Sequence, residues 1–206
     1  MKVEPVILQG VRITLVPMEA SHIAQLYEAL NDPEIWTYSP PVMRSIDDMK
    51  IYVEIALEER ARGNAMPFVI LDKETDRLVG TTRFADISTD HRHLEIGWTA
   101  LAREVWRTRV NTECKYLLLR HCFETLGTVR VQLKADSRNT RSLRAMERIG
   151  AISEGILRSH RILGDGYIRD TAYYSFIASE WPDVKTRLEN MLADRTSLNP
   201  ANPSII

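Results

Sequence analysis

The segment 93–101, with the sequence HLEIGWTAL, carries a carboxylate that can take part in proton chemistry. Its alternating residue types predict a β-strand, whose successive side chains point to opposite faces of a sheet. One face carries Leu94, Ile96, Trp98 and Ala100, and the other carries Glu95, Gly97, Thr99 and Leu101. Glu95 therefore shares its face with small residues. A carboxylate there acts as a general base or pairs with a lysine or arginine, and the residues alone leave both interpretations open.

A second group of polar residues follows the strand predicted at 129–135. Asn139 is a typical N-cap and predicts a short helix that ends at Gly150. Within that helix, Arg141, Arg144 and Arg148 stand three or four residues apart and form one basic strip. Such a strip either contacts phosphate or is simply solvated.

Cysteine and histidine give little support for metal or covalent chemistry. Cys114 and Cys122 are the only two cysteines, and within one predicted helix they lie about 12 Å apart, too far for a disulfide. We expect both to be reduced and structural. The histidines never form a zinc-like cluster with them. His91 and His93 share one face of a strand and could in principle chelate a metal. We interpret them instead as exposed residues of a hairpin, so no metal is predicted.

The composition argues against several function classes. The chain has 206 residues, 44% apolar and 27% charged, which is typical of a soluble globular protein. Its 27 basic and 28 acidic residues give a net charge of -1, which provides no field that attracts nucleic acid. No apolar run approaches the roughly 20 residues that span a bilayer, and the first residues lack a signal-peptide core. We therefore expect a cytoplasmic protein with neither a nucleic-acid nor a membrane partner.

Hydrophobic periodicity and capping residues predict the elements that position these groups. Strands are predicted at 11–16, 68–71, 78–87, 93–101, 129–135, 156–163 and 167–178. Helices are predicted at 23–30, after a capping box of Ser45 and Asp48, at 110–126 before Gly127, after Asn139 and after Ser179. No linker interrupts the chain, so we expect one domain over 1–192. The remaining segment, 193–206, is polar and predicted to be a flexible tail.

Four short segments stand out in this order of elements. They are Leu94–Trp98, Trp106–Glu113, Asn139–Ser142 with Glu147–Ala151 behind it, and the final hairpin around Gly164–Gly166. Each is short enough to recur by chance, but their order and spacing together resemble the GNAT superfamily of N-acetyltransferases. The likeness is greatest to its RimJ/RimL-type ribosomal-protein acetyltransferase branch, and it covers nearly the whole chain.

The resemblance implies an α/β (α+β) fold of the GNAT type. Its central sheet is mixed and mostly antiparallel, has about seven strands, and is flanked by helices. The sheet is splayed between its fourth and fifth strands, which correspond here to 93–101 and to the strand that begins near 129.

The resemblance also implies an acyltransferase that moves an acetyl group from acetyl-CoA to an amine without a metal. In the family, the diphosphate rests on backbone N–H groups at the start of the long helix, and the pantetheine arm pairs with main chain where two strands part. The residues expected to bind acetyl-CoA are Thr99, Ala100, Leu101, Arg107, Thr108, Arg109, Val110, Asn111, Thr112, Asn139 and Ser142.

Two catalytic roles follow from the same resemblance. Glu95 is the candidate general base, acting directly or through a water, and an α-amino group with a pKa of about 7.7 to 8.0 needs only modest help to lose its proton. Ser142 is the candidate general acid, because Met146 occupies the position where many members have a tyrosine; the alternative is a first-turn serine that bonds its own helix. The residues expected to line the acceptor pocket, unless they belong to the core, are Trp36, Tyr38, Tyr173 and Tyr174.

The loop before the long helix departs from the family pattern. Trp106 and Asn111 fit the branch, but Arg107 and Arg109 stand where glycines are usual. A side chain in a left-handed conformation costs roughly 1 to 2 kcal/mol, whereas a charge-assisted hydrogen bond to phosphate contributes roughly 1.5 to 3 kcal/mol. The two effects are comparable, so the sequence does not decide whether these arginines help or hinder cofactor binding.

Two functions of different class remain open. The first is an N-acetyltransferase in which an amine, either a protein N-terminus or a small molecule, attacks acetyl-CoA directly in a ternary complex. The second is a GNAT-fold domain without catalysis that binds an acyl-CoA or a protein partner as a sensor or scaffold. A homodimer, common among relatives, is a further expectation.

Overall fold

The structure is a computed structural model that describes residues 1–38 and 43–194. Within those ranges, one eight-stranded sheet has the order β1-β2-β3-β4-β5-β6-β8-β7. The strands are β1 (Leu8–Gln9), β2 (Ile13–Pro17), β3 (Met66–Asp72), β4 (Arg77–Ser88), β5 (His93–Leu101), β6 (Arg130–Asp136), β7 (Ile152–Ile162) and β8 (Ile168–Ile177). The predicted mixed sheet is confirmed, with one strand more than expected because Leu8–Gln9 pairs with Leu15 and Thr14.

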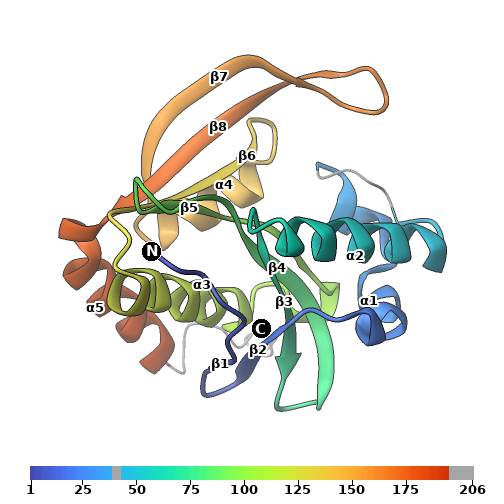
Figure 1. The fold of residues 1–206 in the computed structure, drawn as a ribbon, viewed down its shortest axis with the longest axis horizontal. Coiled ribbons are helices and arrows are strands. Elements are labelled where there is room, and N and C mark those ends of the chain that lie inside the picture. The colour runs from blue at the N-terminus through green and yellow to red at the C-terminus, as the bar shows by residue number, and fades with distance from the viewer. Residues whose placement is uncertain (39–42, 195–206) are drawn as a thin grey trace, which may run out of the picture.

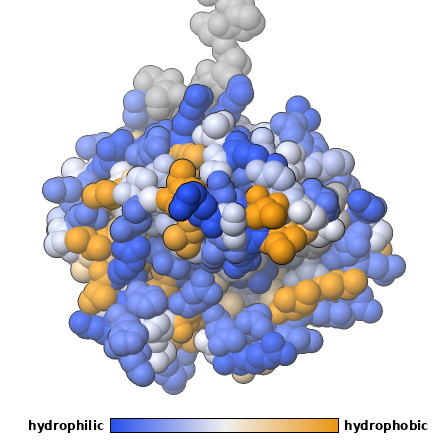
Figure 2. All heavy atoms as spheres, turned by 90° about the horizontal axis from the view of Figure 1, so that it is seen from above, coloured by the Kyte–Doolittle hydropathy of each residue, from blue (hydrophilic) through white to orange (hydrophobic). Residues whose placement is uncertain are grey.

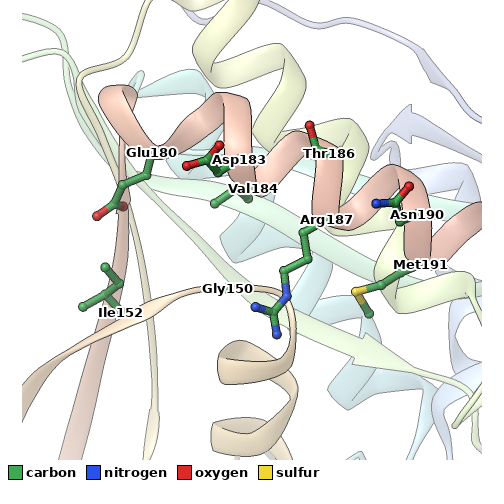
Figure 3. Close-up of a pocket in the computed structure, with 9 residues that line it drawn as sticks. All are labelled: Gly150, Ile152, Glu180, Asp183, Val184, Thr186, Arg187, Asn190 and Met191. Atoms are coloured by element: carbon green, nitrogen blue, oxygen red, sulfur yellow. The ribbon is translucent and has the colours of Figure 1, made fainter.

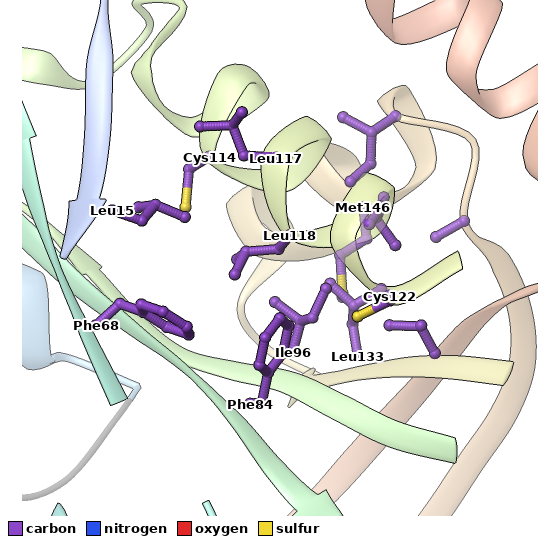
Figure 4. Packing of buried hydrophobic residues seen from close by; sticks show 14 of the residues in the cluster. Leu15, Phe68, Phe84, Ile96, Cys114, Leu117, Leu118, Cys122, Leu133 and Met146 are labelled. Atoms are coloured by element: carbon purple, nitrogen blue, oxygen red, sulfur yellow. The ribbon is translucent and has the colours of Figure 1, made fainter. Parts of the chain in front are cut away.

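Helices cover both faces of this sheet (Figure 1). The helices α1 (Ile23–Leu30) and α2 (Ile46–Ala61) pack on one face, and a buried cluster there includes Leu26, Met49 and Val53. On the other face lie α3 (Val110–Arg120), α4 (Thr140–Arg148) and α5 (Trp181–Ala193). There, Cys114, Leu117 and Leu118 of α3 pack against Leu15, Phe68 and Phe84 of the sheet (Figure 4). The short helices are η1 (Ala20–His22), η2 (Pro33–Trp36), η3 (Arg103–Val105), the π-helical η4 (His121–Leu126) and η5 (Ala178–Glu180).

Local capping signals are confirmed where the sequence predicted them. Ser45 caps α2, with its hydroxyl accepting from the Asp48 N–H at 3.2 Å while Asp48 accepts from the Ser45 N–H. The Asn139 side chain accepts from the Ser142 N–H at 3.0 Å at the start of α4. The helix predicted at 110–126 is α-helical only to Arg120 and continues as the wider η4, which ends at Gly127 with a φ of 65°.

The sheet splays where β5 and β6 meet. These strands run parallel and pair over only three positions, the last joining Glu95 to Gln132. Beyond that point β5 continues beside β4 as far as Leu101, whereas β6 continues beside β8 as far as Asp136. The edge of β5 from Ile96 onward therefore faces a gap, as the sequence resemblance implied. No strand of the described segments pairs with its main chain on that side.

A β-bulge at Trp98 reverses the faces of β5 and corrects the sequence analysis. Arg83 pairs with Gly97 and Thr81 with Ala100, so two residues of β5 oppose one of β4, and Trp98 has a φ of 49°. Leu94 and Ile96 pack in the α3 cluster as expected, but Ala100 packs in the α1–α2 cluster. The prediction that Leu94, Ile96, Trp98 and Ala100 share one face is wrong, because an inserted residue breaks the period-two alternation.

The two cysteines are free, as predicted, and both are fully buried. Burial raises the pKa of Cys114 to about 11, so its thiol stays protonated near neutral pH. None of the helices in the described ranges combines the length and apolar character needed to cross a bilayer. The predicted tail begins with the last residue of α5 and Asp194, and its remaining residues, 195–206, lie outside the described part of the chain.

The hairpin of β7 and β8 projects from the body of the molecule (Figure 1). Nearly every residue of β7 is exposed, including Ile152, Ile156 and Ile162. Seen from above, apolar side chains form separate orange patches in a mostly hydrophilic surface (Figure 2).

Candidate active site

Glu95 lies on β5 at the last residue pair before the sheet splays. Its carboxylate accepts from Lys134 Nζ at 2.6 Å and from Gln132 Nε2 at 3.3 Å. Lys134 also reaches Asp86 Oδ2 at 3.1 Å. The ion pair that the sequence analysis kept as the alternative is therefore present, and its lysine comes from the neighbouring parallel strand.

Burial gives this ion pair unusual proton chemistry. The side chain of Glu95 is 2% exposed and that of Lys134 is 9% exposed. Burial raises the pKa of Glu95, and Lys134 offsets only part of this rise. Burial alone would lower the pKa of Lys134, but Glu95 and Asp86 outweigh it and raise that pKa. Lys134 therefore stays charged, while Glu95 holds a proton more readily than an ordinary glutamate.

Gly97 provides the space for this carboxylate. A Cβ atom at position 97 would lie 2.6 Å from Glu95 Oε1, which is inside van der Waals contact. A larger residue at position 97 would therefore displace the Glu95 carboxylate from this position.

The segment Thr99–Leu101 faces the gap between β5 and β6. The Thr99 hydroxyl accepts from Lys115 Nζ of α3 at 2.7 Å and bonds the Thr82 hydroxyl at 2.9 Å. The Leu101 carbonyl accepts from Trp106 Nε1 at 2.8 Å. These bonds connect the end of β5 to the start of α3. The residues expected to bind pantetheine are therefore adjacent to those expected to bind the diphosphate.

The loop before α3 treats its two arginines differently. Arg107 has a φ of 61°, the left-handed region where glycine is usual, whereas Arg109 has a φ of -71°. Arg109 Nη1 donates to the Leu192 carbonyl at the end of α5, 3.0 Å away. Only position 107 therefore needs glycine geometry, and the side chain of Arg109 is held by α5.

This difference predicts opposite effects for two glycine substitutions. Arg107→Gly is expected to raise the free energy of unfolding by about 0.5 to 1 kcal/mol, because glycine adopts positive φ without strain. Arg109→Gly is expected to lower it by about 1 to 2 kcal/mol, because it removes the bond to α5 and adds backbone entropy. Urea denaturation of both variants measures the free energy of unfolding. Equal changes of the same sign would contradict the conclusion that only position 107 needs glycine geometry.

The first turn of α3 and the helix α4 face each other. Arg141 stacks over the Trp106 ring, with its Cζ 3.8 Å from the centroid, and Arg148 Nη2 donates to Thr112 Oγ1 at 3.0 Å. Thr108 Oγ1 donates to the Val105 carbonyl and accepts from the Val110 N–H. Of the three arginines in the basic strip, Arg148 therefore contacts the segment 107–112 that the resemblance assigned to the diphosphate, and Arg141 contacts Trp106 just before it. Ser142 is half-buried on the first turn of α4, and Asn111 is half-buried on α3.

The four predicted acceptor residues do not share one location. Trp36 and Tyr174 are buried: the Trp36 indole donates to the Leu30 carbonyl at 2.7 Å, and the Tyr174 hydroxyl donates to Glu147 at 2.8 Å on the α4 side of the sheet. Tyr173 lies on the opposite face of β8, where its ring contacts His160. Tyr38 lies against Arg138, which also stacks over Tyr167.

Residues that the sequence analysis did not single out complete the Glu95 face of the sheet. Lys134 and Asp86 flank the carboxylate, and Arg83 lies between the rings of Tyr52 and Trp98. The alternation of Arg130, Gln132 and Lys134 in the sequence marked a polar face of β6, but the parallel register of β5 and β6 was needed to place it beside Glu95.

A separate groove of about 690 Å³ runs between α5 and the turn from α4 to β7 (Figure 3). Arg187 extends across it from α5, and its Nε donates to the Arg148 carbonyl at 2.9 Å. None of the predicted site residues lines this groove. Among the described residues, no three His, Cys, Asp or Glu side chains come together as a metal site.

Comparison with known proteins gives consistent results. A family model described as an acetyltransferase (GNAT) domain matches residues 12–152. The uncharacterised N-acetyltransferase p20 of Bacillus licheniformis is 28% identical over 175 residues, which are 82% of this chain and 95% of p20. A GCN5-related N-acetyltransferase from Brucella melitensis has a TM-score of 0.88 and 27% identity over 94% of this chain and 88% of its own. Mycobacterium smegmatis RimJ in complex with CoA-disulfide has a TM-score of 0.78 over 91% of this chain and 95% of its own, and at 20% identity this likeness shows the fold alone.

Proposed function

The chain belongs to the acetyltransferase (GNAT) family, whose members are acyltransferases, and from that premise we propose that it moves an acetyl group from acetyl-CoA to a primary amine. The observation that carries this proposal is the position of Glu95. Its buried carboxylate lies where β5 and β6 part, while the start of α3 lies beside the far end of the same gap. The unpaired edge of β5 thus connects the proposed base, Glu95, with the start of α3, where the diphosphate is proposed to bind.

The residues around the gap fit acetyl-CoA. Backbone N–H groups at the start of a helix lack intrahelical partners, so the segment from Arg107 to Thr112 suits a diphosphate. Within it, the N–H groups of Thr108 and Val110 bond the Val105 carbonyl and Thr108 Oγ1, which leaves those of Arg107, Arg109, Asn111 and Thr112 as the proposed donors. The main chain of Thr99, Ala100 and Leu101 suits the pantetheine amides, because β6 no longer pairs with β5 there, although the Leu101 carbonyl already accepts from the Trp106 indole. Arg141 of α4 stacks over Trp106 of the same loop, and Asn139 caps that helix one turn earlier. The CoA-disulfide bound by RimJ, a protein of the same fold, supports this assignment.

Acetyl-CoA supplies the activated acetyl thioester, and the side chains supply the proton transfers. The amine nitrogen forms a bond to the acetyl carbon as the carbon–sulfur bond breaks, in a ternary complex without an acyl-enzyme. Glu95 takes a proton from the nitrogen, directly or through a water, and Lys134 holds the carboxylate in position. Ser142 gives its proton to the departing sulfur and regains one from solvent.

Ser142→Ala tests the proposed general acid. The Asn139 cap uses the backbone N–H of residue 142, so the fold is expected to be unchanged. The rate constant kcat is expected to fall about 100-fold, which is the low end of the range that a positioned proton donor contributes. Ser142→Cys restores a proton donor and is expected to recover part of the loss. Parental kcat in Ser142→Ala, measured by thiol release, would remove Ser142 from the mechanism.

Incubation with acetyl-CoA and a pooled set of primary amines tests the proposed function. Release of free CoA thiol that depends on the amines supports acetyl transfer. The alternative is an acyl-CoA sensor or scaffold, and the specific observation in its favour is Arg107, which keeps a left-handed conformation where relatives use glycine. Tight binding of CoA in calorimetry without thiol release would support the sensor instead.

The RimJ/RimL-type branch and the amine acceptor belong to the same proposal. A protein N-terminus and a small-molecule amine both fit a base of this kind, and mass spectrometry of acetylated products from a native extract distinguishes them. The homodimer expected from relatives stays a prediction, which light scattering tests.

A further inference from the structure

Arg83 is a buried cation on the face of the sheet that carries Glu95. It lies on β4, is 4% exposed, and pairs in register with Gly97 of β5. Its guanidinium lies between two aromatic rings, with Cζ 5.1 Å from the centroid of Tyr52 and 5.0 Å from that of Trp98. The rings hold the guanidinium in place and offset part of the cost of removing it from water.

No acidic side chain in the described residues forms an ion pair with Arg83. Its Nε has no hydrogen-bond partner, although the atom is buried. The carboxylates nearby are already used, because Glu95 and Asp86 both bind Lys134. The segments outside the description, 39–42 and 195–206, contain no Asp or Glu. A buried guanidinium without a carboxylate is unusual, since its desolvation is normally compensated by an anion.

We propose that Arg83 binds a carboxylate of the acceptor, so that the acceptor is an amine that also carries a carboxylate. A carboxylate matches the planar donor pattern of guanidinium and forms charge-assisted hydrogen bonds to it. This inference rests on the proposed function, because it assigns a substrate class to the same site.

The register places the two groups at a suitable spacing for such a molecule. Arg83 opposes Gly97 and Ala85 opposes Glu95, so Arg83 and Glu95 are diagonal neighbours on one face of adjacent strands. The acceptor amine lies at Glu95 while its carboxylate lies at Arg83. Trp98, which is 38% exposed, borders Arg83 on one side, and Lys134 lies 5.5 Å from the same ring. Arg83, although itself buried, thus contacts a ring that is partly exposed.

Calorimetric titration of product analogues tests this assignment without turnover. The probes are N-acetyl-L-amino acids and their carboxamides, each titrated into the full chain with and without CoA. N-acetyl-L-aspartate and N-acetyl-L-glutamate α-amides form a third arm, because they present the side-chain carboxylate of an acidic N-terminal residue. At least one free carboxylate is expected to bind roughly 10-fold or more tightly than its matched amide. The third arm distinguishes an amino-acid acceptor from an acidic peptide N-terminus.

Variants of two arginines on one strand identify the residue responsible. Arg83→Met is expected to lower the affinity for the carboxylate roughly 10-fold or more and to leave the affinity for the amide unchanged. Arg83→Lys keeps the charge without the planar fork and is expected to retain an intermediate preference. Arg77→Met is the matched control, because Arg77 lies on the same strand and forms an exposed ion pair with Glu28, and it is expected to change neither affinity.

The outcomes are separable from those of the proposed function. Equal affinity for carboxylates and amides, binding of neither, or a preference that persists in Arg83→Met would overturn the role of Arg83, even if thiol release proceeds. Absence of thiol release with every amine would instead remove the proposed function. Should Arg83→Met fail to fold, the comparison of carboxylate with amide in the parent chain and in Arg83→Lys still decides the assignment.

Discussion

Glu95→Gln is expected to lower kcat/KM for acetyl transfer about 10²- to 10⁴-fold, which is the range a positioned general base contributes. Glutamine keeps the shape of the side chain but accepts no proton from the amine. The ratio of kcat/KM in the variant to that in the parent is measured by thiol release from acetyl-CoA, with the amine that the parent chain turns over. Affinity for CoA is expected to stay unchanged, because Glu95 lies across the sheet from the start of α3.

The matched control for this variant is Asp86→Asn. Asp86 is the other carboxylate bound to Lys134, so its loss changes the charge around the lysine while Glu95 remains. Less than a 10-fold decrease is expected. A Glu95→Gln variant with parental kcat/KM, or an equal loss in both variants, would argue that Glu95 serves the ion pair and not proton transfer.

The pH dependence follows from the raised pKa of Glu95. The ionised form accepts the proton, so kcat/KM is expected to rise with pH through the pKa of Glu95, above the usual glutamate range. This rising part of the pH–rate profile is expected to disappear in Glu95→Gln.

The same rise in the pKa of Glu95 affects the stability of the fold. Because burial raises the pKa of Glu95 in the fold, its favourable contribution is complete below the usual glutamate pKa and is lost as pH rises through the folded value. Glu95→Gln is therefore expected to unfold at no lower temperature than the parent at pH 7.

Glu113→Ala is expected to lower the free energy of unfolding by about 3 kcal/mol. Glu113 lies on the first turn of α3, is 5% exposed, and its carboxylate accepts from the backbone N–H groups of Val11, Arg12 and Ile13. Alanine leaves these donors without their acceptor and removes a negative charge from the positive end of α3. Gly10 packs directly against the same carboxylate.

Thermal unfolding measures this loss, and an exposed glutamate provides the comparison. For a chain of this size, 3 kcal/mol corresponds to a decrease of about 6 to 12 °C in Tm. Glu58→Ala removes a glutamate of α2 whose side chain is 64% exposed, and it is expected to change stability by less than about 0.5 kcal/mol. Similar shifts in both variants would show that Glu113 does not anchor the N-terminal strands to α3.

Much of the fold was predictable because its signals are local. The capping box of Ser45 and Asp48, the Asn139 cap and the αL residue Gly127 each depend on a few adjacent residues. The strand positions followed from period-two alternation, and the splay after Glu95 followed from family resemblance. Alternation failed at Trp98, because a bulge depends on the pairing partner and not on the residue itself.

The sequence by itself determined most of the elements, the reduced state of the two cysteines and the family, since these depend on periodicity, spacing, caps and short motifs. Only the tertiary structure decided how the charged groups are used. In the structure, Glu95 forms an ion pair with Lys134 of another strand, and Arg109 donates a hydrogen bond to the Leu192 carbonyl. Arg83 lies between two aromatic rings and forms no ion pair with a carboxylate of the described residues. The physical reason is that the pKa and the partner of a charge depend on burial and on residues distant in the chain, which the parallel register of β5 and β6 and the packing of α3 against α5 bring together.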